Sequence, residues 1–124
     1  MGVPILKQGD YLIATIQTAL SDTGVLELRD DLAERVGRFR SRGIIIDVAA
    51  LDVIDSFVAR ALRAIVLTAR LRGAETVIIG IQPDVAIAMV QFRLNLEPLR
   101  AALDLDAAKA IILRRTQGDA PDER

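Results

Sequence analysis

The sequence predicts an α/β domain with a mixed, mostly parallel central sheet, an N-terminal hairpin and four helices. Two runs rich in β-branched residues, 43–48 and 76–81, are typical of strands covered on both faces. Segments with apolar residues at helical spacing alternate with these runs. Near the start, two apolar segments are separated by a short turn, as in an antiparallel hairpin. Such alternation favours helices packed on a central sheet.

The predicted hairpin opens the chain. Residues 3–7 form its first strand, and Pro4 indicates that this strand lies at an edge or starts the pairing. Residues 8–10, Gln-Gly-Asp, supply the turn, and residues 11–16 form the second strand.

A long amphipathic helix is predicted next, with Ser21 and Asp22 as capping residues. Its apolar residues recur at steps of three and four and therefore share one face: Val25, Leu28, Leu32, Val36 and Phe39. Acidic residues precede arginines along it, as the helix dipole favours. Gly43 is expected to end the segment. The charged face is interpreted as solvated, with a partner surface as the alternative.

Two further helices follow the buried strands. The second is expected from Phe57 to about Leu71, with Gly73 after it. The third opens at Gln82-Pro83-Asp84, because proline is favoured in a first helical turn. Its core side is expected to carry Val85, Met89 and Phe92.

The end of the chain is expected to add a short edge strand at about 99–103 and a last helix. Asp104 or Asp106 is expected to cap this helix, which runs to about Arg115. Residues 117–124 are polar, with glycine, proline and charges, and are predicted to be a disordered tail. We therefore expect a single domain over residues 1–116.

The composition argues against catalysis. The 124 residues include no cysteine, which excludes disulfides, thiolate zinc sites and cysteine nucleophiles. They include no histidine, which excludes a Ser-His-Asp triad and histidine-ligated metals. The phosphate-binding motif G-x-x-x-x-G-K-[ST] does not occur, and no G-x-G-x-x-G motif follows any predicted strand, so a nucleotide-binding loop is not supported. We expect no enzyme activity, no catalytic residue, no metal site and no cofactor.

Charge and hydropathy argue against two classes of partner, nucleic acids and membranes. The formal net charge is −1 with basic residues scattered among acidic ones, so no nucleic-acid surface is expected. No apolar run is long enough to span a bilayer, so no membrane segment is expected. Together these features favour a cytoplasmic protein.

Ser56 is the residue of greatest functional interest. It stands where the strand at 43–48 leads into the second helix, with Asp52, Asp55 and Phe57 as neighbours. Loops at the carboxyl ends of parallel strands are common functional positions. A hydroxyl at a helix start can cap the free backbone N–H groups, and a phosphate is tolerated there. The pattern alone favours a cap; a phosphorylation switch is the alternative. Thr23, at the start of the first helix, is a second candidate for phosphorylation.

An acidic cluster at the same turn offers another interpretation. Asp47, Asp52 and Asp55 resemble in composition a magnesium site or an aspartyl-phosphate receiver. Such a receiver needs a basic partner for the phosphoryl group, and neither Lys7 nor Lys109 is near this turn in sequence. The cluster is therefore not favoured as a metal or phosphoacceptor site.

Four segments together resemble a STAS domain, the fold of sulfate-transporter tails and anti-sigma-factor antagonists. They are Pro4-Ile5-Leu6-Lys7, Val53-Ile54-Asp55-Ser56-Phe57-Val58-Ala59, Gly80-Ile81-Gln82-Pro83 with Val85-Ala86, and Ala102-Leu103-Asp104-Leu105. They follow the family's order over nearly the whole chain. Many antagonists carry a glycine where Val58 stands. Here Phe57 follows the serine and Val58 replaces that glycine. In both positions the sequence is similar to the RsbS-like stressosome scaffold proteins within the family.

The resemblance implies a STAS fold and a scaffold that self-associates, as a homodimer and in a large assembly with an RsbR-type STAS paralogue. It implies that an RsbT-type serine kinase phosphorylates Ser56 and an RsbX-type phosphatase reverses this. Phosphorylation would then release the sequestered kinase and so regulate a stress-response or signalling pathway. A stand-alone ligand-sensing or anti-anti-sigma STAS binding module is the alternative.

Overall fold

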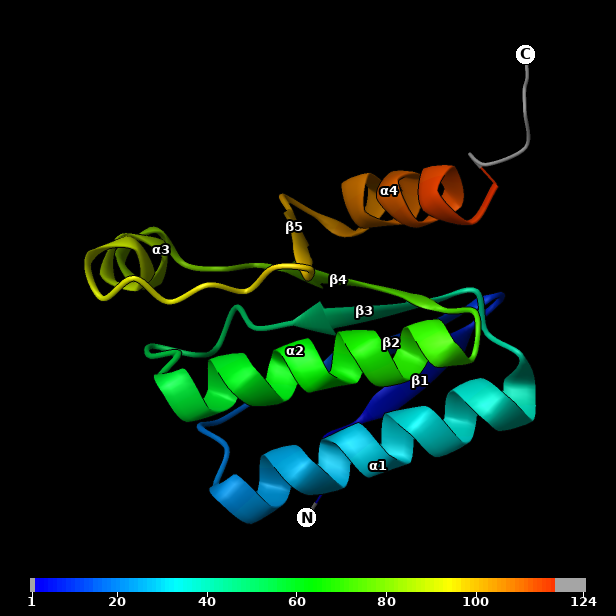
Figure 1. Ribbon diagram of the computed structural model, residues 1–124, viewed down its shortest axis with the longest axis horizontal. Coiled ribbons are helices and arrows are strands. Elements are labelled where there is room, and N and C mark those ends of the chain that lie inside the picture. Colours follow the sequence, from blue (N-terminus) through cyan, green and yellow to red (C-terminus); the bar gives the residue numbers. More distant parts are fainter. Residues whose placement is uncertain (1, 118–124) are drawn as a thin grey trace.

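The computed structural model describes residues 2–117, which form one five-stranded sheet and four helices (Figure 1). The strands are β1 (Ile5–Gln8), β2 (Tyr11–Thr15), β3 (Gly43–Asp47), β4 (Glu75–Ile79) and β5 (Arg100–Ala102). The helices are α1 (Asp22–Phe39), α2 (Ser56–Leu71), α3 (Pro83–Gln91) and α4 (Leu105–Gln117). The sheet order is β1-β2-β3-β4-β5; β1 and β2 pair antiparallel, and the three other neighbouring pairs are parallel. The predicted fold class is confirmed.

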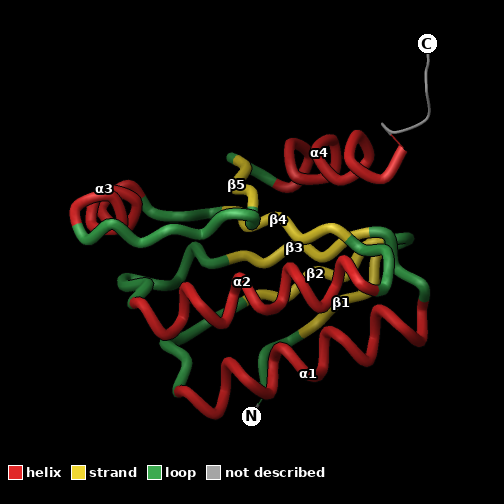
Figure 2. The backbone as a smooth tube through the Cα atoms, viewed as in Figure 1, coloured by secondary structure: helices red, strands yellow, loops and turns green. Residues whose placement is uncertain are grey.

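The sheet lies between two helical layers. Helices α1 and α2 cover one face and α4 lies against the other (Figure 2). In β3, Ile44 and Ile46 pack in the α1–α2 core, whereas Ile45 packs with Ile112 of α4. Because both faces of β3 are covered, its three isoleucines are completely buried, which explains the continuous apolar run in the sequence.

Helix α3 lies beyond the carboxyl ends of β3 and β4 (Figure 1). Pro83 is its first residue, as predicted, and Val85 and Met89 reach the core that α1 and α2 share. This position brings α3 beside the loop that connects β3 to α2.

Each of the other three helices begins at a side-chain cap, and the caps of α1 and α4 test predictions from the sequence. Ser21 Oγ accepts a hydrogen bond from the backbone N–H of Gly24 at 2.9 Å, which confirms the predicted cap of α1. Asp104 Oδ1 accepts one from the N–H of Ala107 at 2.9 Å, which selects Asp104 over Asp106 as the cap of α4.

The prediction that Gly43 ends the first helical segment is wrong. Helix α1 ends at Phe39, and Arg40 takes the left-handed conformation, with φ of 52°. Gly43 is instead the first residue of β3, where an added Cβ would lie 2.6 Å from side-chain carbons of Ile112. The glycine therefore allows α4 to approach the sheet closely.

Two phenylalanines of the predicted apolar helix faces are exposed, and the prediction that Phe92 lies on the core side is wrong. Phe39 is 38% exposed at the end of α1, with the guanidinium of Arg38 4.7 Å and Lys7 Nζ 5.7 Å from its ring centre. Phe92 is 74% exposed. Helix α3 ends at Gln91, and Arg93 with φ of 57° turns the chain before another helical turn is made.

The C-terminal elements follow the expected order. The short edge strand is β5, and α4 extends to Gln117. The rest of the predicted tail, 118–124, lies outside the described residues. Within residues 2–117, none of the helices combines the length and apolar character that crossing a bilayer demands.

Candidate partner-binding site at the start of α2

Ser56 is the first residue of α2 and follows the loop that leaves the carboxyl end of β3. Its side chain is exposed. Within residues 2–117 its hydroxyl makes no hydrogen bond. The hydroxyl is therefore accessible and has no structural partner.

Asp55, and not Ser56, caps α2. Asp55 has extended backbone angles, and its Oδ1 accepts a hydrogen bond from the N–H of Val58 at 2.8 Å. Aspartate and serine are equally good capping residues, so the sequence did not show which of the two adjacent residues does this. The capping role that the pattern alone favoured for Ser56 is therefore wrong.

The connection between β4 and α3 supports the loop that carries Ser56. The side-chain amide of Gln82 donates a hydrogen bond to the carbonyl oxygen of Ala49 at 2.7 Å. Gly80 has φ of +82°, and an added Cβ there would lie 2.9 Å from Asp47 Oδ1. That same Asp47 oxygen accepts the N–H of Ala49 at 2.9 Å. The segment Gly80-Ile81-Gln82-Pro83, directly after β4, was the sequence signal for this support.

An open groove of about 490 Å³ lies beside Ser56. It is lined by Asp52, Val53, Ile54, Asp55 and Ser56 on one side and by Val85, Ala88, Phe92 and Leu94 on the other. Val53 is 69% exposed and Phe92 is 74% exposed. Exposed apolar side chains with a polar rim are typical of surfaces that contact another protein. We call this feature the Ser56 groove.

The structure brings together three of the site residues predicted from the sequence. Ser56, Asp52 and Asp55 line the groove. Phe57 is half-buried in the first turn of α2 and does not line it. Thr23 is exposed in the first turn of α1, away from the groove lining. Sequence reasoning missed Phe92 as a site residue, because helical spacing assigned it to the core.

The acidic residues near the groove have separate roles. Asp47 bonds the Ala49 amide, Asp55 caps α2, and Asp52 is exposed on the loop. Over the described part of the chain, no group of three or more carboxylate, imidazole or thiolate side chains is placed to hold a metal ion.

The sequence profile of the STAS domain matches residues 3–108 of this chain. The chain belongs to the STAS domain family. A structure of RsbS from Moorella thermoacetica, with one serine replaced by glutamate, is 33% identical over 93% of this chain and 97% of that chain, with a TM-score of 0.75. A chain from a structure of the stressosome, described as a signal integration and transduction hub, is 32% identical over 92% and 99%, with a TM-score of 0.70. The predicted RsbS-like STAS identity is confirmed.

A more distant solved structure shares the fold. A proposed anti-sigma factor antagonist from Thermotoga maritima superimposes with a TM-score of 0.73, over 90% of this chain and 95% of that chain. Its sequence is only 13% identical, so the likeness concerns the fold alone. No curated protein matches the sequence.

Proposed function

We propose that this STAS protein is a cytoplasmic, RsbS-like scaffold that binds other proteins and catalyses no reaction. The observation that carries the proposal is the exposed, unbonded hydroxyl of Ser56 at the rim of the Ser56 groove. Identity above 30% over nearly all of the Moorella RsbS chain and of the stressosome chain supports it. The scaffold self-associates and joins an RsbR-type paralogue in a stressosome.

The Ser56 groove is the surface on which an RsbT-type kinase docks. Val53 and Phe92 offer it apolar side chains that are mostly in water in the free protein. Removing such surface from water is worth about 25 cal/mol per Å². Aromatic side chains are also common among the few residues that dominate an interface. The unphosphorylated protein therefore holds the kinase.

Phosphorylation of Ser56 releases that kinase, and an RsbX-type phosphatase restores binding. A phosphoserine adds about 1.5 to 2 negative charges. The rim already carries Asp52 and Asp55, and the carboxylate of Asp55 occupies the N–H of Val58. The helix start therefore has one fewer donor with which to neutralise a phosphate. Because about 1.4 kcal/mol changes an affinity tenfold, a modest electrostatic cost at the interface is sufficient to release the kinase.

No refolding is needed for this switch. Ser56 neither caps α2 nor packs in the core, so a phosphate there leaves the hydrogen bond between Asp55 and Val58 in place. The added charge itself is the signal that the kinase reads.

The assembly is tested by mixing the protein with the RsbR-type paralogue and the RsbT-type kinase of the same organism. Light scattering after size-exclusion chromatography should show a particle far larger than a dimer that retains the kinase. Adding ATP and Mg²⁺ should release the kinase as phosphate appears on Ser56. A protein that forms no large particle with its paralogue, or that keeps the kinase after full phosphorylation, would contradict the proposal.

A further inference from the structure

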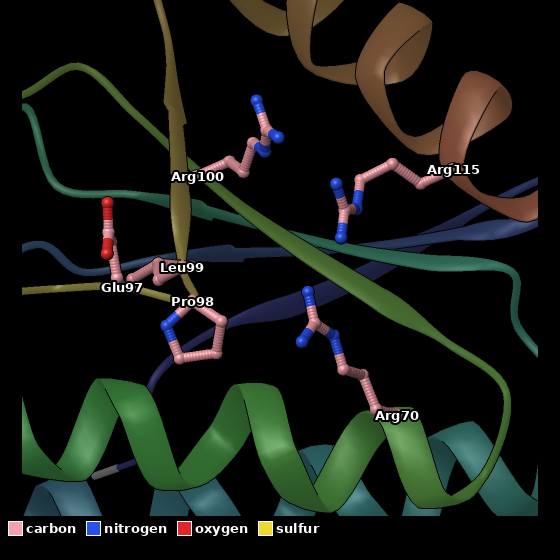
Figure 3. Close-up of a pocket in the computed structure, with 6 residues that line it drawn as sticks. All are labelled: Arg70, Glu97, Pro98, Leu99, Arg100 and Arg115. Carbon is pink, nitrogen blue, oxygen red and sulfur yellow. The ribbon is translucent and has the colours of Figure 1, made fainter.

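A second pocket, of about 450 Å³, lies beside β5. It is lined by Arg70 of α2, Arg100 of β5, Arg115 of α4, and Glu97, Pro98 and Leu99. Figure 3 shows the three arginine side chains extending into the same space beside β5 and α4. We call this feature the arginine pocket.

The arginine pocket carries more positive than negative charge. Glu75 Oε1 accepts hydrogen bonds from Arg70 Nη2 and from Arg115 Nε, both at 3.3 Å. One carboxylate therefore serves two guanidinium groups, at distances longer than is usual for such bonds. Arg100 forms no ion pair within residues 2–117. Glu75 does not line the pocket, and Glu97 is the one acidic residue that does. Three positive charges thus face two negative ones.

The arginines keep hydrogen-bond donors free. Each guanidinium has five N–H groups in a fixed planar fork. Arg70 uses its Nε and Nη2 on Glu75, and Arg115 uses its Nε. The side chains of Arg70 and Arg115 are 30% and 35% exposed, so their charges are less screened than those of fully exposed residues. Such forks match the oxygens of phosphate groups.

We propose that the arginine pocket binds a small molecule that carries a phosphate group, either free or as an ester. Its volume lies in the range of small-molecule sites, which is about 300 to 1,000 Å³. Three guanidinium groups around one space favour a doubly charged anion over a single carboxylate. Pro98 and the buried Leu99 give the pocket an apolar wall that fits the nonpolar part of an ester.

The arginine pocket is separate from the Ser56 groove. Arg70 and Ser56 both lie on α2, at opposite ends of the helix. At a rise of about 1.5 Å per residue they are about 21 Å apart along its axis. A ligand in the pocket therefore does not touch the groove, and the proposed kinase switch does not depend on this inference.

The probes are inorganic phosphate and phenyl phosphate, titrated into the whole protein and followed by NMR of the arginine Nε–Hε signals. We expect the signals of Arg70 and Arg115 to shift and the affinity to fall as salt is raised. Tighter binding of phenyl phosphate would identify an ester as the ligand, and equal or weaker binding would identify free phosphate. If neither probe shifts these signals at millimolar concentration, the proposal is wrong.

Two variants locate the site. Arg100→Gln should weaken binding about tenfold while leaving the fold unchanged, because this residue has no ion pair in the described chain. Arg114→Gln is the matched control, since Arg114 is exposed on the same helix as Arg115 and does not line the pocket. Arg114→Gln and Ser56→Asp should both bind like the wild type. Equal binding by Arg100→Gln and wild type would overturn the assignment.

Discussion

The carboxylate of Asp55 accepts the backbone N–H of Val58 at 2.8 Å. This hydrogen bond caps α2, whereas the next residue, Ser56, is exposed and its hydroxyl makes no hydrogen bond within residues 2–117. Two adjacent polar residues at one helix start therefore have different roles. Asp55 stabilises the helix, and we propose that Ser56 is the residue whose phosphorylation releases the kinase. Mutations at the two positions should consequently have different effects.

Replacing Ser56 with aspartate should weaken kinase binding at least tenfold while the protein stays folded. The added charge lies at the rim of an apolar groove that already bears two carboxylates. Calorimetry with the RsbT-type kinase measures the affinity, and circular dichroism checks the fold. Thr23→Asp is the control, because Thr23 is also an exposed hydroxyl residue in a first helical turn. Equal loss of binding in both variants would show that the effect is not specific to the groove.

Replacing Ser56 with alanine should abolish phosphorylation by the kinase. The variant loses only a hydroxyl that has no hydrogen bond in the described structure, so kinase docking should persist. Mass spectrometry after incubation with kinase and ATP measures the modification. Phosphate found on Ser56→Ala, at Thr23 for example, would move the switch away from the start of α2.

Replacing Phe92 with alanine should reduce kinase affinity about tenfold or more, as expected for an aromatic residue at the centre of an interface. Its side chain is 74% exposed, so the free energy of unfolding should change by less than about 0.5 kcal/mol. Leu71→Ala is the matched control, because Leu71 is 89% exposed at the other end of α2. Wild-type affinity in Phe92→Ala would exclude the groove as the docking surface.

Replacing Asp55 with alanine should lower the free energy of unfolding by about 1 kcal/mol, the usual cost of losing a helix cap. Urea denaturation measures the change. Asp52→Ala removes a neighbouring exposed carboxylate that caps nothing and should stay close to the wild type. An equal loss from both substitutions would indicate that general charge, and not the bond to Val58, stabilises this turn.

Replacing Gly43 with alanine should destabilise the protein by about 1 to 3 kcal/mol, because the new methyl group meets Ile112. Combining it with Ile112→Ala should cost less than the sum of the two single changes, since the second change makes room. Denaturation of all four proteins in this double-mutant cycle measures the difference. If the two changes in the free energy of unfolding are strictly additive, the side chains at positions 43 and 112 do not interact.

The layers of the fold could be predicted from the sequence because burial on both sides leaves a direct pattern. Ile44, Ile45 and Ile46 are consecutive and all completely buried, which is expected of a central strand covered by helices. The buried positions of α1 likewise followed the predicted spacing up to Val36. In α3, by contrast, the predicted spacing placed Phe92 on the core side, but the left-handed backbone at Arg93 ends the helical periodicity there and Phe92 is exposed. Local turn geometry therefore decided the position of an important side chain.

The two candidate sites were visible from the sequence to different degrees. Ser56, Asp52 and Asp55 lie within five residues, so the strand-to-helix turn already placed them together. The opposite wall of the groove comes from α3 and the residues that follow it, and only tertiary packing brings Phe92 there. Arg70, Arg100 and Arg115 come from three different elements. No local pattern connects them, so the arginine pocket was found only in the structure.

The most direct test compares the kinase affinity of two purified forms of the protein, one unmodified and one carrying a single phosphate on Ser56. Intact-mass analysis verifies each form, and phosphatase treatment of the second provides the reversal. We predict that the phosphorylated form binds the RsbT-type kinase at least tenfold more weakly and that phosphatase restores the original affinity. Equal affinity of the two forms would contradict the central claim that charge on Ser56 releases a bound partner.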